Sequence, residues 1–229
     1  MPDVTYYGHW ICPFAKRVKF VLANRGIEHD EIIVPPQAVR PKGMTLPPEF
    51  LQWSPRREIP MIRYKGHYLT DSIPIMEFLE REIAENPMLP ADPVARAAVM
   101  ERVRWLDLNL MLSAVRVYYG ITPEGIATGS RDLAAAFAQM ETWLTGQKWL
   151  CGSEPTLAEA IAIPIYVRLN GLRRLGFSWD GPGPELARHI RQCEMLRGWT
   201  AVAWTGEQED EFTGRFLKYR EIKNRPPAV

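Results

Sequence analysis

The sequence predicts an α/β domain followed by an all-α domain, and three observations support this fold class. Short extended runs alternate with helical patterns over residues 1–86. A proline-containing stretch follows at residues 87–92. From residue 93 to 229 we find helical patterns and no convincing strand. Because strands and helices repeat with periods of two and 3.6 residues, these patterns predict two domains joined by a linker at 87–92.

The first domain is predicted to have the order βαβ, a short helical turn, then ββα. Strands at 4–7 and 31–34 flank a helix that starts at Pro13 and ends at Gly26, a favourable C-terminal cap. After a proline-rich loop and a helical turn at "PPEFLQW", a hairpin spans 61–70 and an amphipathic helix spans 71–85. A helical crossover requires parallel strands, and a hairpin supplies an antiparallel pair. The expected sheet is therefore mixed and four-stranded with helices on both faces, a thioredoxin-like arrangement.

The second domain is predicted to be a helical bundle. "TLAEA" has the pattern of a capping box, in which the Thr156 side chain and Glu159 satisfy amides of the first helical turn. The expected helices are 94–119, 131–145, 156–175, 184–196 and about 209–219.

Composition and charge narrow the function classes. There are 28 basic and 27 acidic residues, so the net charge of +1 disfavours nucleic acid or an anionic membrane as the main partner. No apolar run is long enough to span a bilayer, and the N-terminus has no secretory signal pattern. The three cysteines are widely spaced and lack metal-ligand spacing. We therefore expect no disulfide, no metal and a reducing compartment, by default the cytoplasm.

Cys12, in "ICPFAKR", is the candidate catalytic residue. Pro13 suits the first position of a helix, so the thiol is expected at a helix N-terminus, where unpaired amides favour a thiolate. Lys16 and Arg17 lie one turn on and add to this effect unless they point to solvent. The alternative is an inert cysteine at a strand–helix junction. Because residue 15 is alanine, an oxidised Cys12 has no second cysteine nearby and must be resolved by an external thiol.

Two further motifs each allow a structural and a functional interpretation. In "EIPMI", Pro60 either begins an edge strand as a trans proline or is cis and presents the Ile59 backbone to an extended ligand. In "TDS", Asp71 or Ser72 either caps the following helix or helps to bind a ligand carboxylate and amine.

Taken in this order and spacing, the three motifs resemble the cytosolic glutathione S-transferase family over essentially the whole chain. "CPFAKRV" is similar to the Omega class and related cysteine-type enzymes, and "TLAEA" matches the capping box of the family's helical domain, with Glu159 where aspartate is usual. The resemblance implies that Cys12 faces the sulfur of glutathione and that Phe14 borders it. It also implies that the Ile59 backbone and a cis Pro60 pair with the cysteinyl part.

The remaining contacts are likewise implied by the resemblance. Asp71 and Ser72 would hold the γ-glutamyl end of glutathione. The family's lysine for the glycine end has its matching position near Pro47, so Arg40 or Lys42 is expected to substitute. The second-substrate pocket is expected to include residues that are otherwise loop cover or core: His9, Trp10, Trp105, Asn109 and Arg116.

Some family classes activate glutathione with a tyrosine near the end of the first strand. Tyr6 or Tyr7 is therefore the alternative to Cys12, although a strand directs one inward and the other outward.

The resemblance implies a glutathione-dependent thiol transferase or reductase that acts through a Cys12–glutathione mixed disulfide. One alternative is a transferase in which the glutathione thiolate attacks a small electrophile or cleaves an ether. Another is a non-enzymatic binding protein of the same fold. Glutathione is the expected cosubstrate, the second substrate is a small electrophile or disulfide, and a homodimer is expected.

Overall fold

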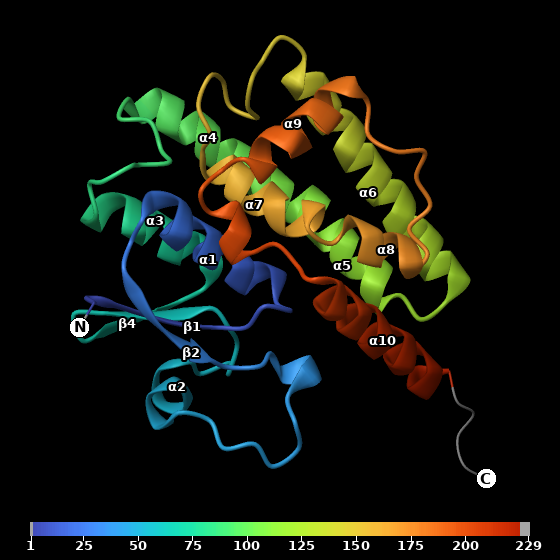
Figure 1. Cartoon of the computed structure of the whole chain (residues 1–229), viewed down its shortest axis with the longest axis horizontal. Helices are drawn as coiled ribbons and strands as arrows, with labels where there is room; N and C mark the ends of the chain where they lie inside the picture. The colour runs from blue at the N-terminus through green and yellow to red at the C-terminus, as the bar shows by residue number, and fades with distance from the viewer. Residues whose placement is uncertain (1, 225–229) are drawn as a thin grey trace. The chain divides into compact units, whose positions relative to one another are not determined.

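A computed structural model describes residues 2–224, which form two compact units (Figure 1). The first unit extends to Ala91 and also includes Met195–Val202. The second comprises Asp92–Glu194 and the chain from Ala203 onward. Segment 195–202 was predicted to belong to the helical domain at 93–229, whereas its contacts place it with the first unit.

The first unit is built on a four-stranded sheet in the order β2-β1-β3-β4. Strand β1 pairs in parallel with β2, whereas β3 pairs antiparallel with both β1 and β4. The predicted mixed sheet of a thioredoxin-like domain is therefore confirmed. The strands are β1 (Val4–Gly8), β2 (His29–Ile33), β3 (Met61–Tyr64) and β4 (His67–Thr70).

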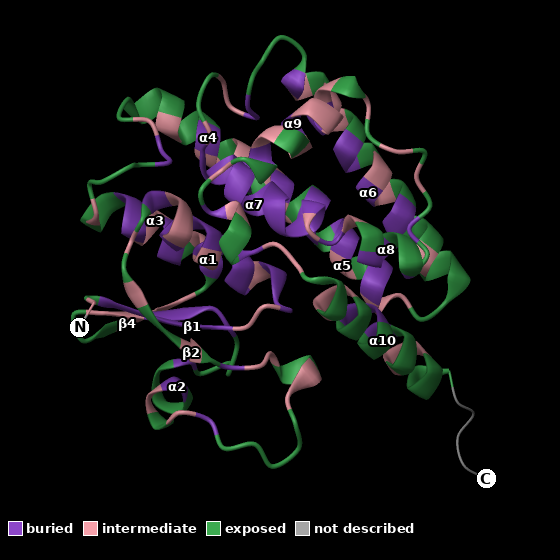
Figure 2. Cartoon of the chain, in the orientation of Figure 1, coloured by how far each residue is buried: buried purple, intermediate pink, exposed green. Residues whose placement is uncertain are grey.

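Helices cover both faces of this sheet. Helices α1 (Pro13–Arg25) and α3 (Ser72–Glu82) pack together on one face, and α2 (Pro48–Trp53) lies on the other. Between β2 and α2, the proline-rich loop contains the short turn η1 (Gln37–Val39). Strand β1 is buried along its whole length (Figure 2). Within it, Tyr6 points to α1 and Tyr7 to α2. The two side chains point to opposite faces of the sheet, as strand alternation predicts, but neither is exposed because α2 covers the second face.

The segment predicted as a linker is tied to the first unit. The backbone amides of Met88 and Leu89 donate to Glu80 Oε2, at 2.9 and 3.0 Å. Glu80 also pairs with Arg25, at 3.0 Å between Nη1 and Oε1, with both side chains buried. These contacts hold the chain between α3 and residue 89 against the end of α1.

The second unit is helical, as predicted. The helix expected at 94–119 is a continuous run of α4, a π-helical stretch η2 and α5. The helix expected at 131–145 begins earlier, because Thr122 caps it and Pro123 occupies its first position. The helix expected at 156–175 is divided in two. The bounds are α4 (Pro93–Leu106), η2 (Asp107–Met111), α5 (Leu112–Tyr119), α6 (Pro123–Leu144), α7 (Leu157–Tyr166), α8 (Leu169–Arg174), α9 (Pro184–Glu194) and α10 (Gly206–Lys223).

Among residues 2–224, none of the helices is both long enough and apolar enough to cross a membrane.

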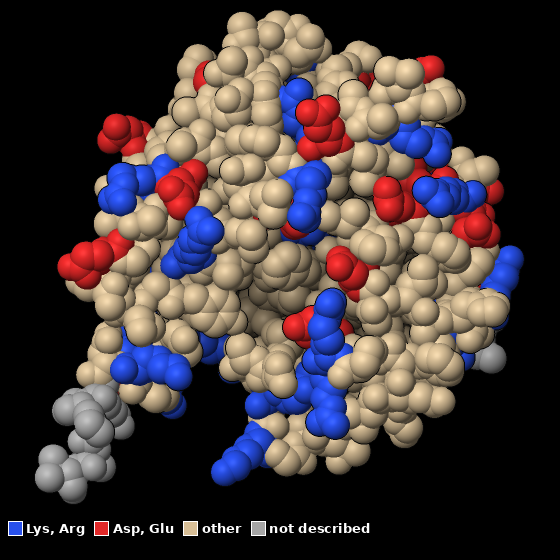
Figure 3. Space-filling model, turned by 180° about the vertical axis from the view of Figure 1, so that it is seen from behind, with Lys and Arg blue, Asp and Glu red and all other residues tan. Residues whose placement is uncertain are grey.

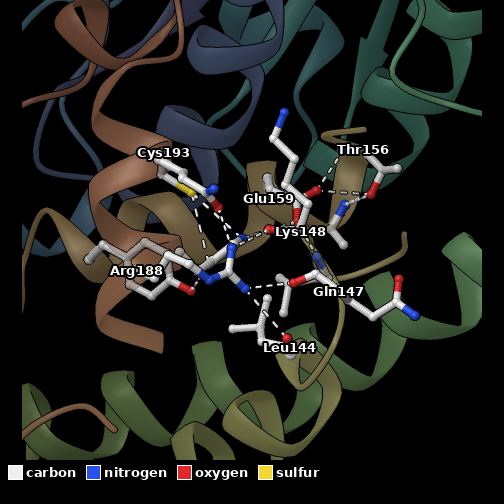
Figure 4. Close-up of polar contacts among 12 residues, drawn as sticks. Leu144, Gln147, Lys148, Thr156, Glu159, Arg188 and Cys193 are labelled. Atoms are coloured by element: carbon white, nitrogen blue, oxygen red, sulfur yellow. Dashed lines mark hydrogen bonds and ion pairs between the residues drawn. The ribbon is translucent and has the colours of Figure 1, made fainter. Parts of the chain in front are cut away.

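The predicted capping box is confirmed and forms part of a larger buried cluster (Figure 4). Glu159 Oε2 accepts the Thr156 amide at 2.6 Å, and Oε1 accepts the Leu150 amide at 2.8 Å. Oε1 also lies 3.3 Å from Nε2 of His189, on α9. These contacts join α7, α9 and the turn before α7. Both Glu159 and His189 are fully buried.

The other two cysteines lie near this cluster. Burial, and secondly Glu159, raise the pKa of Cys151 from its ordinary value of 9.0 to about 11. Burial also raises the pKa of Cys193 well above its ordinary value, with further contributions from Glu159 and Glu194. Both groups therefore remain thiols near neutral pH, as expected for structural cysteines.

We predict that Glu159→Gln lowers the free energy of unfolding by about 2–3 kcal/mol, because a charge-assisted acceptor of several buried donors is lost. Glu159→Asp is the matched variant. It keeps the carboxylate and the capping box but is too short to reach every other donor, so we expect an intermediate loss. Urea unfolding at neutral pH measures both effects. Equal stability of the glutamine variant and the wild type would contradict the cluster's role.

A second prediction concerns alkaline pH. Because the folded-state pKa of Cys151 is raised, the native protein keeps a proton that the unfolded chain loses. This stabilisation is complete below pH 9 and is lost as the pH rises toward 11. In Cys151→Ala, the fall in unfolding free energy over this range should be smaller by about 2 kcal/mol. Denaturant melts across the range measure it, and a slope identical to that of the wild type would refute the assignment.

Candidate active site

Cys12 occupies the N-cap of α1 in an extended conformation, with φ −83° and ψ 119°. Its carbonyl accepts the first helical hydrogen bond, from the Lys16 amide at 3.0 Å. Its side chain makes no capping hydrogen bond, and Sγ lies 3.9 Å from the carbonyl oxygen of Ile59. The thiol therefore sits at the positive end of a 13-residue helix, beside the turn that precedes β3.

The turn beside Cys12 contains a cis peptide bond between Ile59 and Pro60, as the family resemblance implied. The Ser54 hydroxyl stabilises the loop before it by donating to the Glu58 carbonyl and accepting the Glu58 amide, at 3.0 and 3.1 Å. Within residues 2–224, the Ile59 N–H makes no hydrogen bond with another part of the chain. This backbone is therefore available to pair with an extended ligand next to the thiol.

At the start of α3, Asp71 and Ser72 have different roles. Asp71 is the N-cap, with φ +76°, and its exposed carboxylate accepts the Ile73 amide at 3.4 Å. Ser72 is buried, and its hydroxyl accepts a hydrogen bond from Arg17 Nη1 at 3.1 Å. The capping interpretation thus applies to Asp71, while Ser72 contacts a buried cation.

Arg17 connects two of the predicted site residues. Its guanidinium lies 4.7 Å from the centre of the Phe14 ring and binds Ser72. The sequence predicts only that Arg17 aids ionisation of the thiol. It does not predict the position of Arg17 between Phe14 and Ser72, because helical spacing alone does not show that α3 covers this side of α1.

The two tyrosines donate their hydroxyl hydrogens to protein groups. Tyr6 donates to the Ala15 carbonyl at 2.8 Å, and Tyr7 donates to Glu49 at 3.1 Å. Burial raises the pKa of Tyr6 well above its ordinary value, with smaller contributions from Cys12 and Glu31. Burial, and secondly the hydrogen bond to Glu49, raise the pKa of Tyr7 as well. Neither phenol is arranged to become a phenolate near neutral pH.

The candidates for the glycine end of glutathione differ in their surroundings. Arg40 donates to the carbonyl oxygens of Pro35 and Arg57, at 3.1 and 3.0 Å, and so braces its own loop. Lys42 is exposed, and the structure places it in no ion pair with the described residues. Pro47 is the N-cap of α2, so the family's usual lysine position holds no cation.

The expected second-substrate residues lie on two units. In the first unit, the rings of His9 and Trp10 lie 5.6 Å apart in the loop between β1 and α1. In the second, the rings of Trp105 and Trp143 pack edge to face with their centres 4.6 Å apart, and the Trp105 backbone carbonyl accepts a hydrogen bond from Nδ2 of Asn109 at 2.8 Å.

The last of these residues, Arg116, pairs with Asp132 at 2.9 Å. Trp105, near the end of α4, and Asn109, within the π-helical stretch, are thus neighbours, whereas Arg116 pairs with a residue of α6.

On the face shown in Figure 3, acidic and basic side chains are interspersed over the upper part, whereas basic side chains gather toward the lower edge. No group of three or more histidine, cysteine, aspartate or glutamate side chains suited to a metal ion occurs among the described residues.

Comparisons with known proteins agree with this fold. The family model for the glutathione S-transferase N-terminal domain matches residues 11–82, and the model for the C-terminal domain matches residues 123–192. Glutathione S-transferase D7 of Drosophila melanogaster is 24% identical, over 97% of this chain and 100% of that protein. Glutathione S-transferase U4 of Arabidopsis thaliana is 25% identical, over 85% of each chain.

Solved structures show the same fold. The crystal structure of glutathione transferase Omega 3C from Trametes versicolor superposes with a TM-score of 0.81 and 21% identity, covering 97% of this chain and 93% of that one. A rice glutathione transferase in complex with glutathione has a TM-score of 0.81 and 20% identity, covering 94% and 98%.

The fold and the two matching domain models define a two-domain class of protein, with a thioredoxin-like N-terminal domain and a helical C-terminal domain. The chain belongs to the glutathione S-transferase family.

We predict that Tyr7→Phe leaves the rate of Cys12 alkylation by iodoacetamide unchanged, because the phenol is bonded to Glu49. Its free energy of unfolding should fall by about 0.5–1.5 kcal/mol, the usual net value of one hydrogen bond. Tyr6→Phe is the matched variant on the opposite face. A large loss of glutathione-dependent activity in either variant, with the fold intact, would restore the tyrosine alternative.

Proposed function

We propose that this protein is a glutathione-dependent thiol transferase or reductase that acts through Cys12. The observation that carries the proposal is the thiol at the N-cap of α1, 3.9 Å from the Ile59 carbonyl in a cis-proline turn. A helix N-terminus stabilises a thiolate, and the thiolate is the reactive form. Ala15 occupies the place of a second cysteine, so the site is a monothiol.

The surrounding residues support glutathione as the cosubstrate. The Ile59 N–H and C=O have the arrangement needed to pair with the peptide groups of the cysteinyl part, as one added strand does. Ser72 and the N-terminus of α3 would bind the γ-glutamyl carboxylate, with Arg17 behind Ser72. Asp71 would bind the γ-glutamyl amine, and Phe14 would border the sulfur. Arg40 and Lys42 remain the candidates for the glycine end.

The proposed reaction is two successive thiol–disulfide exchanges. The Cys12 thiolate attacks the glutathione sulfur of a glutathionyl disulfide. A Cys12–glutathione disulfide forms, and the other sulfur leaves as a thiolate that takes a proton. The thiolate of a second glutathione then attacks the glutathione sulfur of this intermediate, which releases oxidised glutathione and restores the Cys12 thiolate. Dehydroascorbate-type compounds and glutathionyl thioethers are further substrates of this class.

The second candidate is conjugation of glutathione to a small electrophile, or cleavage of an ether, with the glutathione thiolate as nucleophile. It is favoured by the names of the relatives, since the fly and plant proteins are called glutathione S-transferases D7 and U4 and carry no Omega designation. His9 and Trp10, together with Trp105, Asn109 and Arg116, are the proposed contacts to the second substrate. We further propose a cytoplasmic homodimer.

We predict that Cys12→Ser abolishes exchange with a glutathionyl disulfide, since a hydroxyl does not form the mixed disulfide. Cys151→Ser is the matched control, and its activity should equal that of the wild type. Mass spectrometry of the wild type after treatment with oxidised glutathione should show one glutathione attached to Cys12.

Three outcomes separate the candidates. Loss of exchange in Cys12→Ser supports the thiol transferase. Retained thiol–disulfide exchange in Cys12→Ser contradicts this mechanism. Retained conjugation of glutathione to an electrophile in the same variant supports the second candidate, in which the glutathione thiolate is the nucleophile. A protein that neither binds immobilised glutathione nor forms the adduct is a binding protein of the same fold.

A further inference from the structure

Residues 195–202 form a strap that runs antiparallel along α1, although they come from the C-terminal half of the chain (Figure 1, orange-red beside α1). Arg197 lies against Gly26 at the C-terminal end of α1, where an added Cβ would be 2.5 Å from the guanidinium. At the other end, the ammonium of Lys16 donates to the Val202 carbonyl. The strap therefore contacts α1 near both the N-terminal and the C-terminal end of the helix.

The middle of the strap is closely packed. An added Cβ at Gly198 would lie 2.7 Å from the Phe20 carbonyl oxygen, so any larger residue would displace the strap. The Gly198 amide also donates to the Asn24 side chain at 3.3 Å. These contacts at Gly198 fix the position of the strap along α1. Val202, at the end of the strap, is fully buried beside the first turn of the helix.

Lys16 joins the strap to the site. Its backbone amide donates to the Cys12 carbonyl, and its side chain, which is 4% exposed, donates to the strap. Moving a lysine ammonium out of water is costly in free energy unless the ammonium is hydrogen-bonded. The first turn of α1 is therefore most stable in the position that lets Lys16 reach the Val202 carbonyl.

We propose that Lys16 is a positioning residue for Cys12, and that the strap holds the first turn of α1 so that its amides face the Cys12 sulfur. This role rests on the proposed function of Cys12, and it makes a segment of the C-terminal half part of the catalytic machinery. Any change that loosens the strap is then expected to reduce the stabilisation of the Cys12 thiolate by these amides.

The chain offers a matched control on the same helix. Lys19 lies one turn on, is partly exposed, and pairs with Glu31 at 2.6 Å instead of the strap. Lys19→Met removes a similar charge from α1 while leaving the strap contacts in place.

The test compares four variants, Lys16→Met, Lys16→Arg, Gly198→Ala and Lys19→Met, in the full chain. Two readouts need neither glutathione nor a second substrate. They are the pH profile of Cys12 alkylation by iodoacetamide, with the other two cysteines replaced by serine, and amide hydrogen exchange of the first two turns of α1. A failed proposed function, seen as exchange activity in Cys12→Ser, therefore leaves this test intact.

In Lys16→Met we expect the midpoint of the alkylation profile to move to higher pH by about half a unit. The hydrogen-exchange rate of the amides in the first turn of α1 should rise about tenfold, because one buried hydrogen bond is lost. Lys16→Arg should restore both values, and Lys19→Met should match the wild type. Gly198→Ala keeps every charge and should shift both readouts in the same direction as Lys16→Met.

The proposal is overturned if Lys16→Met lowers thermal stability without moving the alkylation profile. It is also overturned if Lys16→Met moves the profile and Gly198→Ala does not, since that result assigns the effect to the lysine charge alone. If Lys16→Met does not fold, Gly198→Ala decides the question with the same two readouts.

Discussion

The first unit is organised by the requirement that the buried cations of α1 be hydrogen-bonded. Lys16, Arg17 and Arg25 are each less than 5% exposed, and burying a charge without partners is prohibitively costly. The cations find their partners in different places: the strap at 195–202, the start of α3, and the last turns of α3 with the chain that follows it. One helix thus fixes three distant parts of the chain relative to itself.

This arrangement explains why the thiol is held between two defined backbones. On one side, Cys12 belongs to the end of a helix that is anchored along its length. On the other, the Ser54 hydroxyl closes the loop that brings Ile59 beside the sulfur. A reactive group must be held by its surroundings to act at a defined position, and here backbone atoms supply most of that support.

The second unit uses charges at helix ends in a comparable way. Glu159 accepts amides at the start of α7, and Glu141 accepts two amides at the start of α9. Arg188 of α9 donates to the carbonyl oxygens of Leu144 and Gln147 at the end of α6, as Figure 4 shows. Carboxylates at N-termini and a cation at a C-terminus complement the helix dipoles, so the same contacts that join helices also stabilise them.

The sequence by itself determined the order of the elements, the capping box at Thr156 and the place of Cys12 at a helix N-terminus, because these depend on short-range periodicity and on residues close in the chain. It did not show the burial of Tyr7, the contact of Arg17 with Ser72 or the return of residues 195–202 to α1. Those features depend on which elements cover one another, and that was decided only when distant segments packed together. The cations of α1 show the reason most clearly: lysine and arginine side chains are ordinarily exposed, and only the tertiary structure supplies the partners that allow their burial.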